Sequence, residues 1–531
     1  MTERTLGSSG SRCAIATPHA AATRAGAASF DDGGNAIDAA LAAATTLAVV
    51  YPHMCGVGGD LFALVREPDG RIVVVNASGA APAAVDATTL GRLYDEMPSY
   101  GPHTVTVPGA VSGWAELASA WSALGLERAL RPAIAAARDG VPVARSLAAE
   151  VAWDAERLAT DLGLARVFFR DGAPVPEGDL LPQPALGATL TAIARDGADV
   201  LYGGDVGEAI ADHLTTLGAA MTIDDLAAHR VELDSALTAR FRGFDVSVAP
   251  PNSQGFVLLE ILALIQRLGI DVDPLSEDAG TLAEVFRLAS SDRDRHNADP
   301  RHARVPVGTL LDDGHLAGLA DAVAEHASME GSAAGATAPR HGDTIALVAA
   351  DESGLAISLI QSLYDGFGSG ILEPRTGVVL HNRGAGFVLD PSHPNALAGG
   401  KRPAHTLMPV IVTRDGELAA VAGTMGGGAQ PQINAMTLAR SLVLEMSASD
   451  AVASPRWLVG AMGVRGTTRE VVAEADVGPL ASVSLEHAGY SVSGLGIHDE
   501  GAGHAHLILR GPDGRLDAGS DPRADGEASA R

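Results

Sequence analysis

The spacing of apolar positions predicts that the first half of the chain is mainly helical. Between residues 16 and 50, two alanine-rich stretches flank Gly33-Gly34-Asn35, a pattern typical of one helix ending and another beginning. Residues 105–235 continue with helical spacing that Gly and Pro interrupt. The segment 256–268 is apolar nearly all round, so we expect a buried helix there.

Paired apolar runs around turn residues predict β-hairpins, most of them late in the chain. A further strand is expected at 244–249. The four hairpins are expected at 61–77 around Pro68-Asp69-Gly70, 344–362 around Asp351 to Gly354, 407–422 around Asp415-Gly416, and 506–518 around Pro512-Asp513-Gly514. Hairpins set among helices favour an α+β fold with antiparallel sheets covered by helices, rather than alternating βαβ units.

The charge balance excludes two classes of partner. The 531 residues include 37 Lys and Arg against 65 Asp and Glu, a formal net charge of −28. Such an acidic surface argues against binding nucleic acid or an anionic membrane, because both require clustered cations. Hydrophobic residues make up 47% of the chain, which is enough for a sizeable core. The length favours about three domains, or one large domain.

Cysteine usage and the N-terminal residues predict a cytoplasmic protein. Cys13 and Cys55 are too few for a disulfide framework. Residues 1–12 lack the apolar core of a secretory signal, and no apolar stretch is long enough to span a membrane. We therefore expect a soluble enzyme with no membrane partner.

Glycine-rich and histidine-rich segments carry no cofactor or metal signature. The glycine clusters lie at 56–59, 366–370 and 423–428. They fit no phosphate loop, because Gly-Lys-Ser/Thr is missing and the first cluster has the reverse of the Rossmann order. The Gly-x-Ser-x-Gly elbow of serine hydrolases is also missing. The histidine and acidic side chains near the C-terminus are expected to be surface or supporting groups: His498, Asp499, His504 and His506. We therefore predict neither a cofactor nor a metal.

The junction between Asp343 and Thr344 is the strongest local signal for catalysis. A polar, Ala- and Gly-rich stretch with the composition of a linker, 325–342, runs directly into a predicted strand. If the chain were cut before Thr344, that residue would carry both a hydroxyl and a free α-amine. An α-amine has a pKa of about 7.7–8.0, so it can act as a base for its own hydroxyl. The alternative is a threonine that merely begins a strand.

A hydroxyl nucleophile that attacks a carbonyl also needs N–H donors for the oxyanion. Gly426-Gly427-Gly428 follows the predicted strand 417–422 and is a suitable loop of backbone donors. The alternative is an ordinary flexible turn.

Short motifs follow one another in a fixed order along nearly the whole chain. They are Gly33 to Ala40, Pro52-His53 with the loop 56–59, Val107 to Val111, Pro132 to Gly140, Pro250 to Gly255, Asp292 to Arg295, Phe367 to Gly370, Lys401-Arg402-Pro403 and Gly426-Gly427. In this order they resemble the γ-glutamyltranspeptidase family of N-terminal nucleophile hydrolases. The number of ordered motifs makes the resemblance specific.

The resemblance implies a four-layer αββα sandwich of two antiparallel sheets between helices. It also implies a proenzyme that cleaves itself between Asp343 and Thr344. The large segment, residues 1–343, would end in the linker 325–343, and the small segment, 344–531, would begin with the nucleophile. Both segments would form one αββα domain and stay together as a heterodimer, or as a dimer of such heterodimers.

The resemblance assigns catalytic roles to four residues. Thr344 occupies the position of the nucleophile, and Ser362 falls where a second hydroxyl contacts the nucleophile's amine. Gly426 and Gly427 fall at the oxyanion hole.

The substrate pocket departs from the family pattern. Family members that act on γ-glutamyl groups have an arginine for the substrate α-carboxylate where this chain has Ser78. Their asparagine after the second hydroxyl is Tyr364 here, and their paired serines are His405-Thr406. The segment that usually holds the α-amino group runs from Asn382 to Phe387 and contains Arg383 in place of an acid.

These departures imply a substrate that carries a carboxylate and no α-amine. Arginine forms bidentate pairs with carboxylates, so Arg383 is expected to hold that group, although a structural ion pair is an alternative role for it. The substrate-binding residues are expected to be Arg383, Asn382, Tyr364, His405 and Thr406.

The same pattern resembles the γ-glutamyltransferase-like branch that includes oxamate amidohydrolase. It implies hydrolysis of a small, oxamate-like amide through an acyl-enzyme on an N-terminal threonine. Three alternatives stay open: a glutathione hydrolase or γ-glutamyltranspeptidase, a cephalosporin (glutaryl) acylase, and a non-catalytic scaffold that is never processed.

Overall fold

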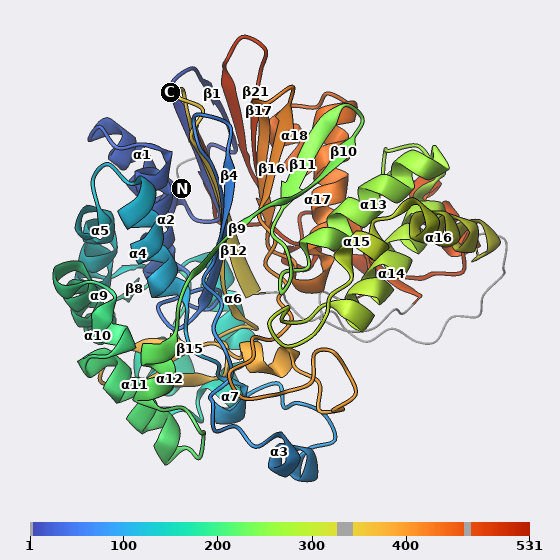
Figure 1. The fold of residues 1–531 in the computed structure, drawn as a ribbon. Helices are drawn as coiled ribbons and strands as arrows, with labels where there is room; N and C mark the ends of the chain where they lie inside the picture. The colour runs from blue at the N-terminus through green and yellow to red at the C-terminus, as the bar shows by residue number, and fades with distance from the viewer. Residues whose placement is uncertain (1–3, 327–342, 461–468) are drawn as a thin grey trace.

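Two seven-stranded antiparallel sheets form the centre of the computed structural model, which describes residues 4–326, 343–460 and 469–531 (Figure 1). The strand order of the first sheet is β1 (Gly7–Gly10), β22 (Leu516–Ser520), β21 (Ala505–Arg510), β17 (Glu417–Thr424), β16 (Val410–Arg414), β11 (Phe244–Val248) and β10 (Leu237–Phe241). The order of the second is β23 (Glu527–Ala530), β2 (Cys13–Thr17), β12 (Asp343–Asp351), β13 (Ala356–Tyr364), β3 (Asp60–Arg66), β4 (Ile72–Asn76) and β9 (Glu232–Ser235).

Helices cover the outer face of each sheet, so the molecule has four layers (Figure 1). The layer on the side of the second sheet contains α1 (Ala20–Asp31), α2 (Ala36–Val50), α4 (Ala110–Trp121), α5 (Leu126–Asp139), α9 (Pro184–Asp196), α10 (Asp199–Tyr202), α11 (Asp205–Thr216) and α12 (Ile223–Ala228). The layer on the side of the first sheet contains α13 (Gly255–Leu268), α14 (Ala279–His296), α15 (Val307–Leu310), α16 (Asp313–His326), α17 (Gln430–Leu438), α18 (Ala448–Ala453) and α19 (Pro479–His487). This arrangement confirms the predicted αββα sandwich.

The remaining elements are short. The helices among them are α3 (Ala87–Leu93), α6 (Arg145–Trp153), α7 (Ala155–Leu158) and α8 (Leu162–Phe168), with single turns at η1 (Pro102–Thr104), η2 (Arg383–Gly386), η3 (Gly427–Ala429), η4 (Ala439–Val443) and η5 (Glu500–Ala502). The small sheets pair β5 (Val141–Pro142) with β8 (Leu180–Leu181), β6 (Phe169–Arg170) with β7 (Ala173–Pro174), β14 (Ile371–Glu373) with β15 (Val378–Leu380), and β19 (Glu470–Glu474) with both β18 (Trp457–Val459) and β20 (Ser491–Leu495).

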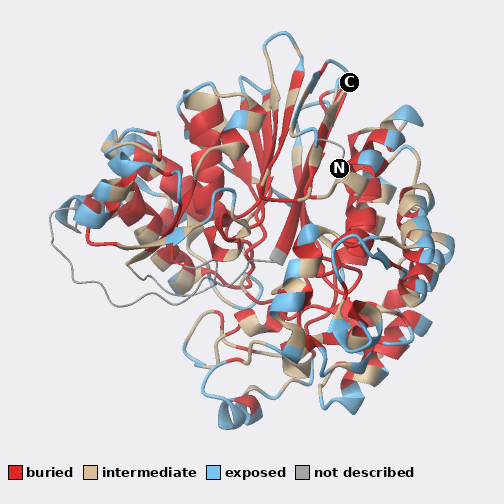
Figure 2. Cartoon of the chain, turned by 180° about the vertical axis from the view of Figure 1, so that it is seen from behind, coloured by how far each residue is buried: buried red, intermediate tan, exposed pale blue. Residues whose placement is uncertain are grey.

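The central strands are buried on both faces, which explains their long apolar runs. Along β13 every residue from Ala356 to Leu363 is buried, and in Figure 2 the sheets are red through the middle of the molecule. One face of the second sheet packs against α2, and the other packs against the first sheet through residues such as Ala346 and Ile360. A strand enclosed in this way has no solvent face, so strict alternation of apolar and polar residues disappears.

The four predicted hairpins are confirmed as β3–β4, β12–β13, β16–β17 and β21–β22. The buried helix expected at 256–268 is α13. The first helix begins at Ala20 rather than at residue 16, because the preceding residues form β2. Most of the expected linker 325–343 lies outside the described residues.

The histidines near the C-terminus require a correction. His504 and His506 are not surface groups: both are buried, and burial lowers the pKa of the first to about 3 and of the second to about 4. His498 is exposed, as predicted. The reason is that His506 lies on β21, the third strand of the first sheet, and His504 immediately precedes that strand, so both are enclosed and can only be supporting groups.

Both sheets combine strands from before residue 327 with strands from after residue 342. In the second sheet, β12 lies between β2 and β13, and β13 in turn pairs with β3. In the first sheet, β11 pairs with β16 and β1 pairs with β22. Among the described helices, none is long and apolar enough to cross a membrane.

The start of α2 offers a test of what stabilises the helical layer. Asp38 is buried and accepts hydrogen bonds from the backbone N–H groups of Asn35, Ala123 and Leu124 at 2.9, 3.0 and 2.9 Å. We expect Asp38→Ala to lower the free energy of unfolding by about 2–4 kcal/mol, because it leaves several donors unpaired. Thermal and denaturant unfolding midpoints measure this loss.

The matched control for that variant is Asp32→Ala. Asp32 is exposed and pairs with the exposed Arg128, a contact expected to contribute less than about 1 kcal/mol. An equal loss of stability in both variants would contradict the role given to the buried carboxylate.

Candidate active site

Thr344 is the second residue of β12, and it meets Ser362 on the neighbouring strand. Its Oγ1 lies 2.9 Å from Ser362 Oγ, and both side chains are buried. The register of β12 and β13 shifts between Asp343 and Ile345, so Thr344 sits at a β-bulge. A bulge redirects a side chain relative to the regular alternation of a strand. Ser362 Oγ also accepts a hydrogen bond from the backbone N–H of Tyr364 at 2.8 Å, which fixes the serine hydroxyl.

Arg383 begins the η2 turn and is almost completely enclosed, with 1% of its surface exposed. Its Nη1 donates to Thr406 Oγ1 at 3.0 Å, and its guanidinium lies 4.1 Å from the centre of the Tyr364 ring. Tyr364 has φ of 87°, a rare conformation for a residue other than glycine. Through this residue the turn that follows β13 connects the Ser362 hydroxyl with the arginine.

The guanidinium of Arg383 has donors to spare. Its Nε and Nη2 are buried and have no hydrogen-bond partner within the described part of the chain, and no carboxylate there forms an ion pair with it. Burial lowers the pKa of this group below its ordinary value, while the nearby Tyr364, Asp60 and Asp365 oppose that change. A buried cation with free donors is a place where an anion gains two hydrogen bonds and a charge partner.

Asp60, a residue that sequence reasoning did not single out, supplies negative charge behind this arginine. The side chain is fully buried, and its Oδ2 lies 3.1 Å from His405 Nε2 and 3.5 Å from His381 Nδ1. Although burial opposes its charge, the two histidines and Arg383 hold the pKa of Asp60 below its ordinary range. Burial, followed by the charge of Arg383, lowers the pKa of His405 to about 3.

At neutral pH, therefore, His405 is a neutral group that donates to a charged Asp60. Its Nδ1 accepts from the backbone N–H of Leu407 at 3.3 Å, which fits a proton on Nε2. The aspartate therefore offsets part of the charge of Arg383, without contacting its free donors.

Among the predicted substrate-binding residues, Asn382 already uses both polar atoms of its side chain in hydrogen bonds within the protein. Its Nδ2 donates to Ser99 O at 2.7 Å and to Asp365 Oδ2 at 2.8 Å, and its Oδ1 accepts from Asp365 N at 3.1 Å. These contacts hold the turn after β13 in place.

Gly426 and Gly427 lie at the end of β17, in backbone conformations that require glycine. Their φ values are 153° and 51°, and a Cβ on Gly426 would lie 2.5 Å from Ile433 Cδ1. Within the described residues, the N–H groups of this pair donate no hydrogen bond. Free, adjacent N–H groups on a rigid turn are the arrangement that an oxyanion hole needs.

Two side chains that sequence reasoning did not single out anchor this glycine turn. Gln254 Nε2 donates to Gly427 O at 2.9 Å and to Thr406 O at 2.7 Å. Arg293 Nη1 donates to Gly428 O at 2.8 Å and to Gln254 Oε1 at 3.3 Å. Both residues belong to motifs of the ordered series, 250–255 and 292–295. That membership is the sequence signal that could have pointed to them. Because these two side chains hold the carbonyl groups of Gly427 and Gly428, they fix the orientation of the turn that carries the free N–H groups.

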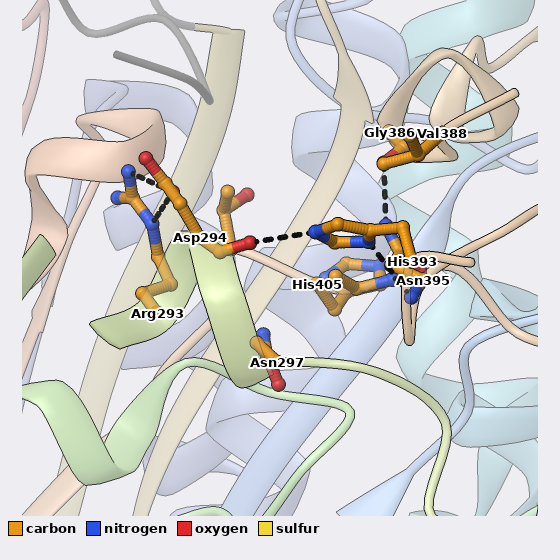
Figure 3. A pocket seen from close by; sticks show the side chains of 10 residues that line it. Arg293, Asp294, Asn297, Gly386, Val388, His393, Asn395 and His405 are labelled. Atoms are coloured by element: carbon orange, nitrogen blue, oxygen red, sulfur yellow. Dashed lines mark hydrogen bonds and ion pairs between the residues drawn. The ribbon is translucent and has the colours of Figure 1, made fainter. Parts of the chain in front are cut away.

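A cavity of about 260 Å³ opens beside Thr406 (Figure 3). His393 Nε2 contacts Asp294 O at 3.0 Å, and Asn395 Nδ2 donates to Gly386 O at 2.7 Å. The residues that line the cavity are Arg293, Asp294, Asn297, Gly386, Val388, His393, Asn395, Ala404, His405 and Thr406. The cavity therefore reaches two of the predicted substrate-binding residues, while Thr344 and Arg383 are not among its lining residues.

The structure thus brings together most of the predicted site. Contacts join Thr344, Ser362 and Tyr364 into one group, and Tyr364, Arg383 and Thr406 into a second that shares the tyrosine. The glycine turn is linked to Thr406 through Gln254. Through Tyr364, a buried guanidinium with unpaired donors is thus linked to a pair of buried hydroxyl groups. Among the described residues, no cluster with metal-ligand spacing is formed by His498, Asp499, His504 and His506.

Comparison with known proteins agrees with this geometry. The family model "Gamma-glutamyltranspeptidase" matches residues 22–531. The chain is 38% identical to the oxamate amidohydrolase proenzyme of Klebsiella pneumoniae, with 96% of this chain and 97% of that protein covered. It is 36% identical to the glutathione hydrolase-like YwrD proenzyme of Bacillus subtilis, with 98% of each covered.

A solved structure extends the comparison to the fold. The cephalosporin acylase of Bacillus halodurans matches with a TM-score of 0.91 and 31% identity, over 100% of this chain and 98% of that one. The fold is therefore that of the N-terminal nucleophile hydrolases, and the relatives are named as hydrolases and acylases. The chain belongs to the gamma-glutamyltranspeptidase family and is an amide-cleaving enzyme of that family.

Proposed function

We propose that this enzyme hydrolyses a small amide that carries a carboxylate, using Thr344 as the nucleophile after self-cleavage. The observation that carries the proposal is the buried Arg383, whose Nε and Nη2 have no partner in the described residues. A carboxylate of about the size of oxamate would use both donors and would balance the buried charge. The similarity to a protein named as an oxamate amidohydrolase proenzyme supports the same substrate class.

The processing step is proposed to begin with attack of Thr344 Oγ1 on the carbonyl carbon of Asp343. The peptide C–N bond breaks as the C–O bond forms, and the nitrogen becomes the free α-amine of Thr344. Water then hydrolyses the ester, which releases the carboxylate of Asp343 and restores the hydroxyl. The segments 1–343 and 344–531 would remain together as a heterodimer, since strands of both segments pair with each other in both sheets.

In turnover, the α-amine of Thr344 takes the hydroxyl proton as Oγ1 attacks the substrate amide carbon. Ser362, 2.9 Å from that oxygen, orients it. The N–H groups of Gly426 and Gly427 stabilise the oxyanion, an effect of about 3–4 kcal/mol per donor in comparable sites. The nitrogen of the substrate leaves with the proton, and water cleaves the acyl-enzyme to give the acid. Arg383 and Thr406 hold the substrate carboxylate, with the Tyr364 ring beneath the guanidinium.

The surroundings of Ser78 argue against a γ-glutamyl substrate. This residue stands where the family resemblance places an arginine for the α-carboxylate. Ser78 is fully buried, and its Oγ donates to Asn76 Oδ1 at 2.7 Å, so it offers a substrate neither a charge nor a free hydrogen. Glutathione hydrolysis and glutaryl-amide cleavage are therefore the competing activities in the experiments below.

Processing can be tested on a denaturing gel. Wild-type protein is expected to give two bands whose masses sum to 53.9 kDa, the larger one from residues 1–343. Thr344→Ala should give a single full-length band, because the attacking hydroxyl is gone. Thr344→Ser retains a hydroxyl and serves as the control, which should still be cut. An active wild-type enzyme that stays uncut would sink the processing proposal.

The role of Arg383 can be tested with oxamate and its neutral analogue oxamide. Arg383→Ala should lower kcat/KM for oxamate by about 100-fold, since charge-assisted hydrogen bonds to the carboxylate are lost. The same variant should lower activity on oxamide far less, because oxamide has no carboxylate. Self-cleavage should persist, because the bond that is cut, between Asp343 and Thr344, belongs to the chain itself and needs no bound carboxylate. Arg383→Lys keeps the charge and should recover part of the loss. Wild-type preference for a γ-glutamyl anilide or a glutaryl amide over oxamate would contradict the proposed substrate.

The base can be tested by the pH dependence of kcat/KM. The α-amine must be unprotonated to act, so activity is expected to fall as pH decreases, with a midpoint no higher than about 8. The cation of Arg383 lies on the same side of the site and would lower that midpoint. His405, with its pKa at about 3, cannot supply such a limb, and neither can Asp60, whose pKa is lowered. A profile that is flat between about pH 5 and 9 would rule out the amine as base.

A further inference from the structure

A second cluster of chemically active side chains lies outside the proposed active site, among three helices. Glu260 is on α13, Asp292 is on α14 and His315 is on α16. These helices pack against one another on the outer side of the first sheet (Figure 1). The three side chains each direct one ligand atom to a common point, and these atoms lie within 4.8 Å of one another.

The carboxylate of Glu260 is the unusual member of this cluster. It is fully buried, and no donor of the backbone or of another side chain is hydrogen-bonded to either of its oxygens within the described residues. Burial and the neighbouring Asp292 carboxylate, with which it shares a hydrogen bond when protonated, raise the pKa of Glu260 to about 10. The atom nearest to it in an ion pair is His315 Nε2, 3.7 Å from Oε1, which is too long for a hydrogen bond. An unpaired carboxylate in a protein interior is costly, so its position requires a proton, an ion or another compensating group.

We propose that Glu260, Asp292 and His315 form a binding site for one divalent transition-metal ion such as Zn²⁺. Once Glu260 has released its proton to solvent, two carboxylates and an imidazole would give a donor set with a charge of −2, which one divalent ion would neutralise. Carboxylate oxygens and imidazole nitrogen are ordinary zinc ligands, and three protein ligands leave a fourth position for water. His315 is 27% exposed on its side chain, so solvent reaches the cluster from that side.

The distances fit a small ion after a slight adjustment. Ligand atoms about 2.0 Å from a tetrahedral zinc ion are about 3.3 Å from one another. Here His315 Nε2 lies 2.6 Å from Asp292 Oδ2 and 3.7 Å from Glu260 Oε1, one shorter and one longer than that spacing. A small rotation of the Asp292 carboxylate away from the imidazole would replace their direct hydrogen bond by two bonds to the ion.

The metal site would join the helices that support the glycine turn of Gly426 and Gly427. Gln254 lies immediately before α13, and Arg293 follows Asp292 on α14; both donate to carbonyl groups of that turn. An ion held between α13, α14 and α16 would therefore fix the two anchors relative to each other. The expected role is structural, and it is separate from the proposed substrate and nucleophile.

Zinc binding by the full-length protein tests the proposal directly. Protein without an affinity tag is treated with a chelator, dialysed against Zn²⁺ and analysed for metal content and for affinity by competition with a chromogenic chelator. Wild type is expected to retain one equivalent. Glu260→Gln and His315→Gln should weaken binding by at least about 100-fold, because each removes a ligand. Zinc should also raise the Tm of wild type and not that of the variants.

The matched control is His487→Gln, which changes an exposed histidine on α19 in the same helical layer. It should retain the equivalent of zinc and the Tm response. Substitution by Co²⁺ supplies a spectroscopic readout, since a visible absorption band that disappears in His315→Gln reports coordination by that imidazole. Wild type that binds no zinc, or variants that bind it as tightly as wild type, would overturn the proposal. Circular dichroism of each variant establishes that it has folded. Since His315 is partly exposed, its substitution is expected to disturb folding less than substitution of the buried Glu260.

Discussion

The position of β12 inside the second sheet is the constraint on which the remainder of the structure depends. This strand pairs with β2 on one side and with β13 on the other, and its faces contact α2 and the first sheet. It cannot shift by one residue without moving its whole apolar set, because both faces are buried. Thr344 is therefore held at a defined point, where the bulge turns it toward Ser362. A strand in the interior of a sandwich gives a reacting group more exact placement than a surface loop could.

Around this fixed point, charge is arranged in an unusual way. The buried Arg383 has an aromatic ring beneath it and a single hydroxyl acceptor in the described residues, while the buried Asp60 is satisfied by histidine and by the backbone N–H of Gly79. The hydrogen-bonding capacity of the aspartate is thus used by the protein, whereas two donors of the arginine remain unpaired within the described residues. This difference would favour an anion as the ligand of the proposed site, even though the chain as a whole carries a formal charge of −28.

Much of the fold could be predicted from sequence, because hairpins and buried helices leave local signals. The turns at Pro68-Asp69-Gly70 and Asp415-Gly416 located two of the hairpins, and the Asp343-Thr344 junction located the start of a central strand. The roles of Asp60 and Gln254 could not be predicted in this way. Asp60 and His405 are 345 residues apart, and their contact depends on the way both sheets stack. Burial of His506 could not be predicted for a related reason, since the position of β21 inside the first sheet does not follow from the residues of that strand alone.

Both sheets contain strands from each side of residue 343, and this determines what a cut there would mean for the molecule. Ladders of hydrogen bonds join β2 to β12, β3 to β13, β11 to β16 and β1 to β22, so each part would complete the sheets of the other. Neither part would have a closed core by itself, and parting them would be the same event as unfolding. Two chains held in this way could not exchange partners with other molecules in solution. Because separation would coincide with unfolding, the unfolding midpoint of the cut protein would depend on its concentration, which is not so for an uncut chain.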